Sequence, residues 1–320
     1  MKTIVNTLNV SDIKNFNLIF SKDFILKNIK PERKLVLKEI RYADAYLASA
    51  AIRIDKEFLD CAPNLKVIGS PSTGVDHMDL KLIKKKNIVC YDIAKEYKLI
   101  NSFTATSELA FGLILNINRK IHPAIIETKK GIWGRENYQG FQLLGKTFGI
   151  LGLGRLGLIS ANIAKGFGMK VIANDIKKIN KKNIKMVGLN DLARLSDVIS
   201  IHVHLNKSTE NMIGDNFLSL MKPSAILINT ARGKIVNEKA LLNALKKNKI
   251  AGAGLDVIDG EWLDRENKKK HALIRYANEH NNLLITPHIG GATKESIQGA
   301  RIFMAKKVAN FLMNKKKVSR

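Results

Sequence analysis

The fold is decided by residues 147–157, Thr-Phe-Gly-Ile-Leu-Gly-Leu-Gly-Arg-Leu-Gly. The apolar run over 148–151 is of the kind that forms a strand buried on both faces. The glycines that follow it fit the pattern G-x-G-x-x-G. Beyond them, Ile159, Ile163 and Phe167 recur at i, i+4 spacing and predict a helix with one apolar face. A second strand is expected over 170–173, so the stretch predicts a β-α-β unit.

Each glycine of the pattern has a physical task. Gly152 permits the tight turn after the strand, Gly154 lets the backbone approach a pyrophosphate, and Gly157 lets the helix pack closely on the strand. The N–H groups and the positive dipole end at the start of the helix then face the phosphates. The sequence therefore predicts a dinucleotide-binding site.

Asp175 indicates which dinucleotide binds there. It lies 18 residues after Gly157 (175 − 157), close to where a carboxylate accepts a hydrogen bond from a ribose hydroxyl. The same carboxylate would repel a 2′-phosphate, so NAD is favoured over NADP. Lys177 and Lys178 follow directly and weaken that preference.

Length and composition are those of an ordinary globular protein. The 320 residues suffice for two domains, with 45% hydrophobic and 26% charged residues. No stretch approaches the ~18 consecutive apolar residues of a membrane helix, and no secretory signal is expected. Cys61 and Cys90 have neither disulfide nor metal-ligand spacing, and we expect both as buried apolar groups in a reducing cytoplasm.

The net charge of +26 suggests a nucleic-acid partner, but its pattern does not. The lysines are scattered in short runs that are not interleaved with aromatic residues, which make up 6% of the chain. We therefore expect solvated lysine faces and no nucleic-acid binding. The charge would still favour encounter with anionic substrates and cofactors.

Strands and helices alternate along the rest of the chain. Before the glycine pattern, strands are expected at 45–48, 65–69 and 88–91, and helices at 56–61 and 81–86. A long helix over Thr104–Ile121, followed by Pro123, would be a spine crossing a domain boundary. After the glycine pattern, strands are expected at 197–205, 225–229, 252–257 and 283–286. With the two around the pattern they make six and imply a doubly wound parallel sheet, while a helix over Lys294–Met313 would pack back on the first domain.

Ligands of such a sheet bind beyond the carboxyl ends of its strands, and candidate chemical groups fall there. His288 is the natural proton carrier near neutral pH, and a neighbouring carboxylate, such as Glu261, would orient it. The planar guanidinium of Arg232 suits the carboxylate of a 2-keto acid. Spacing alone leaves three rivals to Glu261: Asp259, Asp264 and Glu266.

His202 and His204 lie two positions apart and would share one face of a strand. A metal pair there would need a third ligand, and none occurs at a recognisable spacing. No metal site is predicted.

Five motifs together resemble the D-isomer-specific 2-hydroxyacid dehydrogenase family, which includes D-lactate dehydrogenases, glyoxylate/hydroxypyruvate reductases and 3-phosphoglycerate dehydrogenases. They are Ser72–His77, Gly149–Gly157, Leu227–Gly233, Gly254–Val257 and Thr286–Gly291. The resemblance implies α/β architecture with two Rossmann-like doubly wound parallel-sheet domains. A split substrate domain, 1–101 and 292–320, would surround an inserted NAD-binding domain, 102–291. It further implies an NAD-dependent oxidoreductase that interconverts a 2-keto acid and a D-2-hydroxy acid, as a homodimer through the cofactor domains.

The resemblance also implies a role for each matched residue. His288 would be the acid/base, Glu261 would support it, and Arg232 would bind the substrate carboxylate and carbonyl. Backbone N–H groups of Gly74 and Val75 would hold the substrate carboxylate. The cofactor would be contacted by Gly152, Gly154, Arg155, Leu156 and Gly157 at the pyrophosphate, Asp175 at the ribose, Val203, His204, Thr230 and Ala231 along its flank, and Asp256 at the carboxamide.

The chain departs from the family pattern at two places. The usual Glu-Pro is Glu261-Trp262, and a long charged segment follows over 263–282. Where the phosphoglycerate enzymes have an arginine, this chain has Ala48-Ser49-Ala50, with Arg53 the nearest cation. The second departure argues against 3-phosphoglycerate as the substrate.

Two alternatives to a general 2-keto acid reductase follow from the resemblance. One is a dedicated 3-phosphoglycerate dehydrogenase or hydroxypyruvate/glyoxylate reductase. The other is a non-catalytic NAD-sensing protein, like the corepressors called C-terminal binding proteins. Arg232, Glu261 and His288 together favour an enzyme, because a binding module has no need of an acid/base pair.

Overall fold

The computed structural model describes residues 1–8, 13–20, 23–177, 179–262 and 268–314. The chain divides into two compact units, which are Met1–Phe103 with Thr293–Arg320, and Thr104–Ala292. The second unit is thus inserted in the chain between the two parts of the first. Each unit is built on a parallel sheet with helices on both faces, which confirms the expected α/β class.

The second unit, within its described residues, holds a seven-stranded sheet in the order β12-β11-β10-β9-β6-β7-β8. Every neighbouring pair is parallel. The strands are β6 (Thr147–Leu151), β7 (Lys170–Asn174), β8 (Lys185–Met186), β9 (Val198–Ile201), β10 (Ile226–Asn229), β11 (Gly252–Leu255) and β12 (Leu283–Ile285). The sequence predicted six of them and missed β8, which has two residues and no periodicity. The strand order reverses direction at β6, so a ligand crevice is expected at its carboxyl end.

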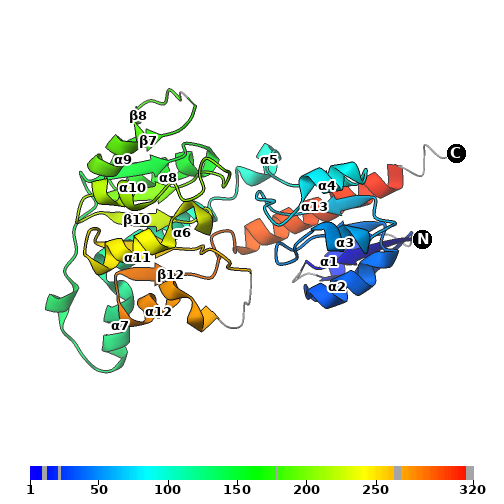
Figure 1. The fold of residues 1–320 in the computed structure, drawn as a ribbon, viewed down its shortest axis with the longest axis horizontal. Coiled ribbons are helices and arrows are strands. Elements are labelled where there is room, and N and C mark those ends of the chain that lie inside the picture. Colours follow the sequence, from blue (N-terminus) through cyan, green and yellow to red (C-terminus); the bar gives the residue numbers. More distant parts are fainter. Residues whose placement is uncertain (9–12, 21–22, 178, 263–267, 315–320) are drawn as a thin grey trace. The chain divides into compact units, whose positions relative to one another are not determined.

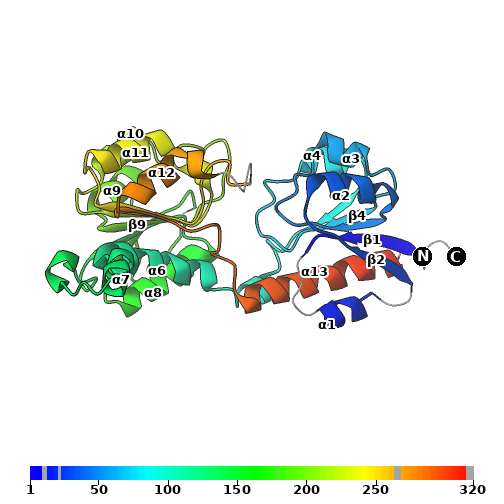
Figure 2. The ribbon, with the colours of Figure 1, turned by 90° about the horizontal axis from the view of Figure 1, so that it is seen from below.

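Helices cover both faces of this sheet (Figure 2). One face carries α9 (Leu189–Leu195), α10 (Asp215–Leu220), α11 (Glu238–Lys246) and α12 (Ala272–Glu279), and the other carries α6 (Ala105–Arg119) and α8 (Arg155–Gly166). The short 3₁₀ turns are η2 (Arg135–Tyr138), η3 (Gly233–Ile235) and η4 (Lys268–Lys270). The central strands are buried throughout, so each reads as an apolar run and not as an alternating one.

Helix α8 buries small residues against the sheet. The sequence predicted one apolar face with Ile159, Ile163 and Phe167, and these three are half-buried or exposed, with Ile163 packed against the core. The residues that face the sheet are small, namely Gly157, Ser160, Ala161 and Ala164. Small side chains let the helix approach the strands closely, and that approach decides which face is buried.

The long helix α6 is also used differently from the prediction. It lies within the second unit and packs on β10 and β11, where Gly254 leaves room for Leu113 and Ile117, so it is not a spine across the boundary. Lys120 ends it in the left-handed conformation, with φ of 49°. A further helix, α7 (Ile121–Lys129), begins at once and contains Pro123 in its first turn, where a missing N–H costs nothing.

The first unit holds, in its described residues, a five-stranded parallel sheet in the order β2-β1-β3-β4-β5. The strands are β1 (Lys2–Asn6), β2 (Phe24–Asn28), β3 (Ala45–Leu47), β4 (Val67–Gly69) and β5 (Val89–Tyr91). The helices are α1 (Ile13–Leu18), α2 (Arg33–Glu39), η1 (Ile40–Tyr42), α3 (Lys56–Asp60), α4 (Leu80–Lys85), α5 (Tyr97–Ile100) and α13 (Lys294–Asn314). Figures 1 and 2 show α13 lying along the sheet of this unit.

The C-terminal helix belongs to the first unit, as the sequence predicted. Met304 and Val308 of α13 pack where Gly69 in β4 has no side chain, and a Cβ at Gly69 would lie 2.6 Å from Val308 Cγ2. The two cysteines are free and half-buried, not fully buried as expected. Burial raises the pKa of Cys90 to about 11. Among the helices that the structure describes, none combines the length and apolar character needed to cross a bilayer.

Candidate active site

The glycine loop between β6 and α8 is shaped by contacts that only glycine allows. Gly152 has φ of +95°, and a Cβ there would lie 2.8 Å from Val203 Cγ1 and 2.9 Å from the carbonyl of His202. A Cβ at Gly157 would lie 2.2 Å from the Gly152 carbonyl oxygen. At Gly154 no atom lies within 4 Å of that position. Two glycines therefore make the turn and the helix contact, while the middle one leaves space beside the backbone.

The first turn of α8 begins at this open glycine. Gly154 is the N-cap and supplies no side-chain cap, and Arg155 and Leu156 are the first residues of the helix. The Leu156 carbonyl accepts a hydrogen bond from Ser107 Oγ of α6 at 3.0 Å, which ties the turn to the neighbouring helix. Partial burial lowers the pKa of the Arg155 guanidinium. First-turn N–H groups and a helix dipole are a suitable setting for a phosphate.

Asp175, just beyond β7, is held beside this loop. Its Oδ2 accepts from the Leu153 N–H at 2.8 Å, and its Oδ1 accepts from the Lys177 N–H at 2.8 Å. A carboxylate has about four acceptor positions, so a ribose hydroxyl has room to donate to it. Lys178, which weakened the predicted preference for NAD, lies outside the described residues.

The residues predicted to flank the cofactor follow β9 and β10. Thr230 is buried, and its Oγ1 has no hydrogen-bond partner among the described residues. Val203 and Ala231 are half-buried, and His204 is exposed. A buried hydroxyl without a partner is costly, and a polar ligand would satisfy it.

His202 and His204 do not form a metal pair. Strand β9 ends at Ile201, so neither histidine lies on it as predicted. Nε2 of His202 is within 2.9 Å of Ser200 Oγ, and burial lowers the pKa of His202 to about 4, so this ring is neutral. No cluster of three or more metal-ligating side chains occurs in the part of the chain that the structure describes.

NAD fits these residues. The space at Gly154, the start of α8 and the hydroxyl of Thr230 all lie at the carboxyl ends of the central strands. Asp175 stands at the end of the neighbouring strand, where it would receive the ribose.

His288 and Glu261 meet, although 27 positions separate them. Nδ1 of His288 lies 2.7 Å from Glu261 Oε1, and both side chains are largely buried, with 29% and 16% of each exposed. Of the three rivals, Asp259 is used through its backbone N–H, which donates to Glu238 Oε1 at 2.7 Å. Asp264 and Glu266 lie outside the described residues. Among the described residues, the carboxylate that contacts the imidazole is that of Glu261.

Asp256 holds the loop that carries His288. It is buried, and its Oδ1 accepts from Thr286 Oγ1 at 2.6 Å and from the Ile289 N–H at 2.8 Å. Its Oδ2 accepts from the Gly290 N–H at 2.7 Å. His288 between them has φ of +56°, a conformation that L-residues rarely adopt without such support. Three of the about four acceptor positions of the Asp256 carboxylate are used, and the predicted contact to the carboxamide of the cofactor would take the fourth.

Arg232 is positioned by its own strand end. Asn229, buried at the end of β10, donates through Nδ2 to the Arg232 carbonyl at 2.9 Å and accepts at Oδ1 from the Ala231 N–H at 3.0 Å. The arginine donates through Nη1 to the Ala231 carbonyl at 2.7 Å. Gly233 lies against the next segment, because a Cβ there would be 2.1 Å from the carbonyl carbon of Ile258. The loop of Arg232 and the segment leading to Glu261 are thus in backbone contact.

Sequence reasoning missed several supporting residues. Asn229 is a polar residue at the end of an apolar run, which is a usable signal. Glu238 gave none, since the first turn of a helix is an ordinary place for an acid. In the structure it faces His271 Nε2 at 3.3 Å, and burial raises its pKa. Trp262 was noted only as a departure, and its ring lies against that of His288.

Gly74 and Val75 belong to the first unit. They are half-buried in the turn after β4, where the Val75 carbonyl accepts from the Met78 N–H at 2.9 Å. Their predicted contact with a substrate carboxylate stays a prediction.

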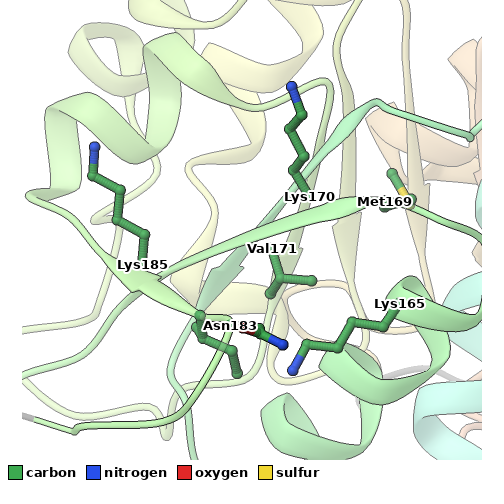
Figure 3. Close-up of a pocket in the computed structure, with 7 residues that line it drawn as sticks. Lys165, Met169, Lys170, Val171, Asn183 and Lys185 are labelled. Carbon is green, nitrogen blue, oxygen red and sulfur yellow. The ribbon is translucent and has the colours of Figure 1, made fainter.

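A hollow of about 630 Å³ in the second unit is not part of this site. It is lined by Lys165, Met169, Lys170, Val171, Asn183, Ile184 and Lys185, near the starts of β7 and β8, away from the glycine loop. Figure 3 shows Lys165 reaching toward Asn183, while the amino groups of Lys170 and Lys185 point elsewhere. Because the charged groups diverge, they do not form a common anion site.

The fold and the site define an NAD-binding oxidoreductase. Residues 111–290 match the family model described as "D-isomer specific 2-hydroxyacid dehydrogenase, NAD binding domain". The chain is similar to the glyoxylate reductase of Thermococcus litoralis, at 38% identity over 88% of this chain and 84% of the relative. It is also similar to the D-3-phosphoglycerate dehydrogenase of Methanocaldococcus jannaschii, at 34% identity over 87% of this chain and 51% of the relative.

A solved structure agrees with these relatives. The D-lactate dehydrogenase of Aquifex aeolicus, complexed with NAD and lactic acid, superposes with a TM-score of 0.86 at 30% identity, covering 99% of this chain and 97% of that one. The chain belongs to the D-isomer specific 2-hydroxyacid dehydrogenase family. It is an NAD-dependent oxidoreductase that acts on the CH–OH group of 2-hydroxy acids, which confirms the predicted function and cofactor.

Proposed function

We propose that this enzyme reduces a small 2-keto acid, such as glyoxylate or hydroxypyruvate, to the D-2-hydroxy acid, with His288 as the proton donor. The observation that carries the proposal is the 2.7 Å contact between His288 Nδ1 and Glu261 Oε1. A histidine oriented by a carboxylate is a general acid with one ring nitrogen engaged and the other directed at the substrate.

His288, oriented by Glu261, transfers the proton. When bound at the glycine loop, reduced NAD would be the source of the hydride. His288 donates the proton from Nε2 to the carbonyl oxygen, because Nδ1 is occupied by Glu261. The carboxylate stabilises the imidazolium that is present before donation and fixes its orientation. In the reverse direction, the neutral imidazole accepts the hydroxyl proton.

The substrate is held by its carboxylate. We assign Arg232 to this carboxylate and to the carbonyl oxygen, since a guanidinium binds planar anions through paired N–H donors. Gly74 and Val75 are proposed to add backbone N–H donors. The cofactor is assigned to the glycine loop, Asp175 and the residues after β9 and β10, and the orphaned hydroxyl of Thr230 supports that assignment.

A small substrate is favoured over 3-phosphoglycerate. The segment Ala48-Ser49-Ala50 offers no cation, and Ala48 is fully buried in the core of the first unit. A phosphate group would need an arginine or lysine to offset the cost of removing its charge from water. The similarity to a glyoxylate reductase supports the same choice.

We further propose that the enzyme is a cytoplasmic homodimer that associates through α7 and the segment after it. No residue of α7 is buried in the described chain. Its exposed apolar residues and those that follow are Ile121, Ile125, Ile126, Ile132 and Trp133. Several exposed apolar residues in one helix and the segment that follows it are typical of an interface.

The test is a screen of 2-keto acids with NADH, followed by loss of absorbance of the reduced cofactor. Glyoxylate or hydroxypyruvate should be turned over, and the His288→Ala variant should lose about 10²–10⁴-fold in kcat while NADH binding is nearly unchanged. His280→Gln, a change at an exposed histidine outside the site, is the matched control. Tight NADH binding without turnover of any 2-keto acid would instead identify a non-catalytic NAD sensor.

A further inference from the structure

Trp262 lies against the face of the His288 ring. The ring centroids are 5.3 Å apart, and the planes are inclined by 39°. The turn that precedes the tryptophan contains Gly260 with φ of +65°. One turn therefore delivers two neighbouring residues to the same imidazole, the Glu261 carboxylate to its Nδ1 edge and the indole to its face.

The Glu261 carboxylate alone does not fix the orientation of the imidazole ring. A single hydrogen bond at Nδ1 fixes one atom of the imidazole and permits the ring to tilt about that atom. The indole face restricts the tilt by contact. Trp262 is 38% exposed, so water is excluded from only part of this contact.

We propose that Trp262 is a positioning residue of the reaction site, which holds the imidazole of His288 at its working angle. The inference rests on the proposed role of His288 as the proton donor. Two acidic side chains also contact the loop that carries His288. Glu261 accepts at the ring edge, and Asp256 accepts from the backbone N–H groups of Ile289 and Gly290. The family's usual proline at this position has no aromatic face.

The first test needs no turnover. The chain has two tryptophans, and Trp133 is 89% exposed, so a Trp133→Phe protein reports the emission of Trp262 alone. A protonated imidazole in contact with an indole quenches its emission by accepting an electron from the excited ring. The emission should therefore be lower when the imidazole is protonated than when it is neutral, so it should fall when acid is added. Adding His288→Gln should abolish the change, and a change that persists in that double variant would overturn the contact.

The second test asks whether the contact matters to the reaction. In the Trp133→Phe parent, Trp262→Leu should lower kcat for the 2-keto acid by roughly fivefold with KM for NADH unchanged. Trp262→Phe should recover most of the loss, because it restores an aromatic face. Equal kcat for the leucine variant and the parent would refute the positioning role. So would a leucine variant that raises KM for NADH at constant kcat, since Trp262 would then be a wall of the cofactor site.

The two tests separate the inference from the proposed function. A parent protein that turns over no 2-keto acid refutes the proposed function, and the fluorescence titration still decides whether the indole and imidazole are in contact. If the leucine variant does not fold, as judged by its thermal unfolding, Trp262→Met replaces it in the kinetic comparison, because methionine is also apolar and has no aromatic face. Equal kcat for that variant and the parent would then refute the positioning role.

Discussion

Removing the carboxylate of Asp256 should release the loop that carries His288. This side chain accepts three hydrogen bonds from the loop, at 2.6 to 2.8 Å, and only 1% of the residue is exposed. Two of the donors are backbone N–H groups, which cannot turn away without moving the loop. The Asp256→Ala variant therefore leaves buried donors without acceptors, and His288 loses the restraint that keeps its φ at +56°.

The loss in the free energy of unfolding can be estimated from those three hydrogen bonds. Hydrogen bonds to a charged group contribute about 1.5–3 kcal/mol each, and water entering the vacated space recovers part of the loss. We expect Asp256→Ala to lower the free energy of unfolding by about 3–5 kcal/mol. Asp256→Asn keeps one acceptor oxygen but turns an N–H toward a backbone N–H, so roughly half of that loss is expected.

Thermal unfolding and steady-state kinetics measure the two consequences. The midpoint should fall by roughly 10 °C for Asp256→Ala, since each kcal/mol shifts a domain of this size by about 2–4 °C. Turnover should fall about 10²-fold, because a displacement of 1 Å at a reacting group has that cost. Asp215→Asn, at an exposed position at the start of α10, is the control. If Asp256→Ala shows the expected decrease in the unfolding midpoint but an unchanged kcat, the loop keeps His288 in place without Asp256.

Three further predictions concern the cofactor, His202 and the oligomer. Asp175→Ala should relax the preference for NADH over NADPH, and an unchanged ratio of kcat/KM values would mean that the ribose is recognised elsewhere. His202 has a pKa of about 4 in the folded chain against an ordinary 6.5, so the unfolded chain binds the proton first as the pH falls through that window. Stability should drop by up to about 3 kcal/mol between those two pH values, and His202→Gln should remove this share of the drop in urea unfolding curves. Ile125→Lys, which places a charge on the exposed face of α7, should convert a dimer to a monomer in sedimentation, and an unchanged mass would exclude this helix from the interface.

Local signals determined much of the second unit. Strand β6 follows from an apolar run, and the glycine loop follows from the steric needs of a tight turn, both of which act over a few residues. The start of α11 is equally local, because Asn237 accepts from the Ala240 N–H at 3.0 Å as an N-cap. Each of these features is decided by neighbours in the chain, so the sequence alone is sufficient.

Tertiary contacts decided the rest. Periodicity predicted helix α8 and its apolar face, but only the close approach of the helix to the sheet explains why Gly157 and other small residues are the fully buried ones. Strand β8 was missed because its pairing with β7 supplies what its two residues lack. We expected His202 and His204 on a strand, but the pairing of β9 with β6 ends at Ile201.

The reaction site divides in the same way. The sequence by itself determined that a histidine and an arginine stand at strand ends, since each follows an apolar run that must be buried. It did not determine which acid meets His288, because a separation of 27 positions along the chain leaves the end-to-end distance open. Only the packed fold, in which Gly233 brings two backbones together and Asp256 ties down the loop, selects Glu261 and places Trp262 on the ring. Side chains distant in sequence are joined by packing, and packing depends on the whole chain at once.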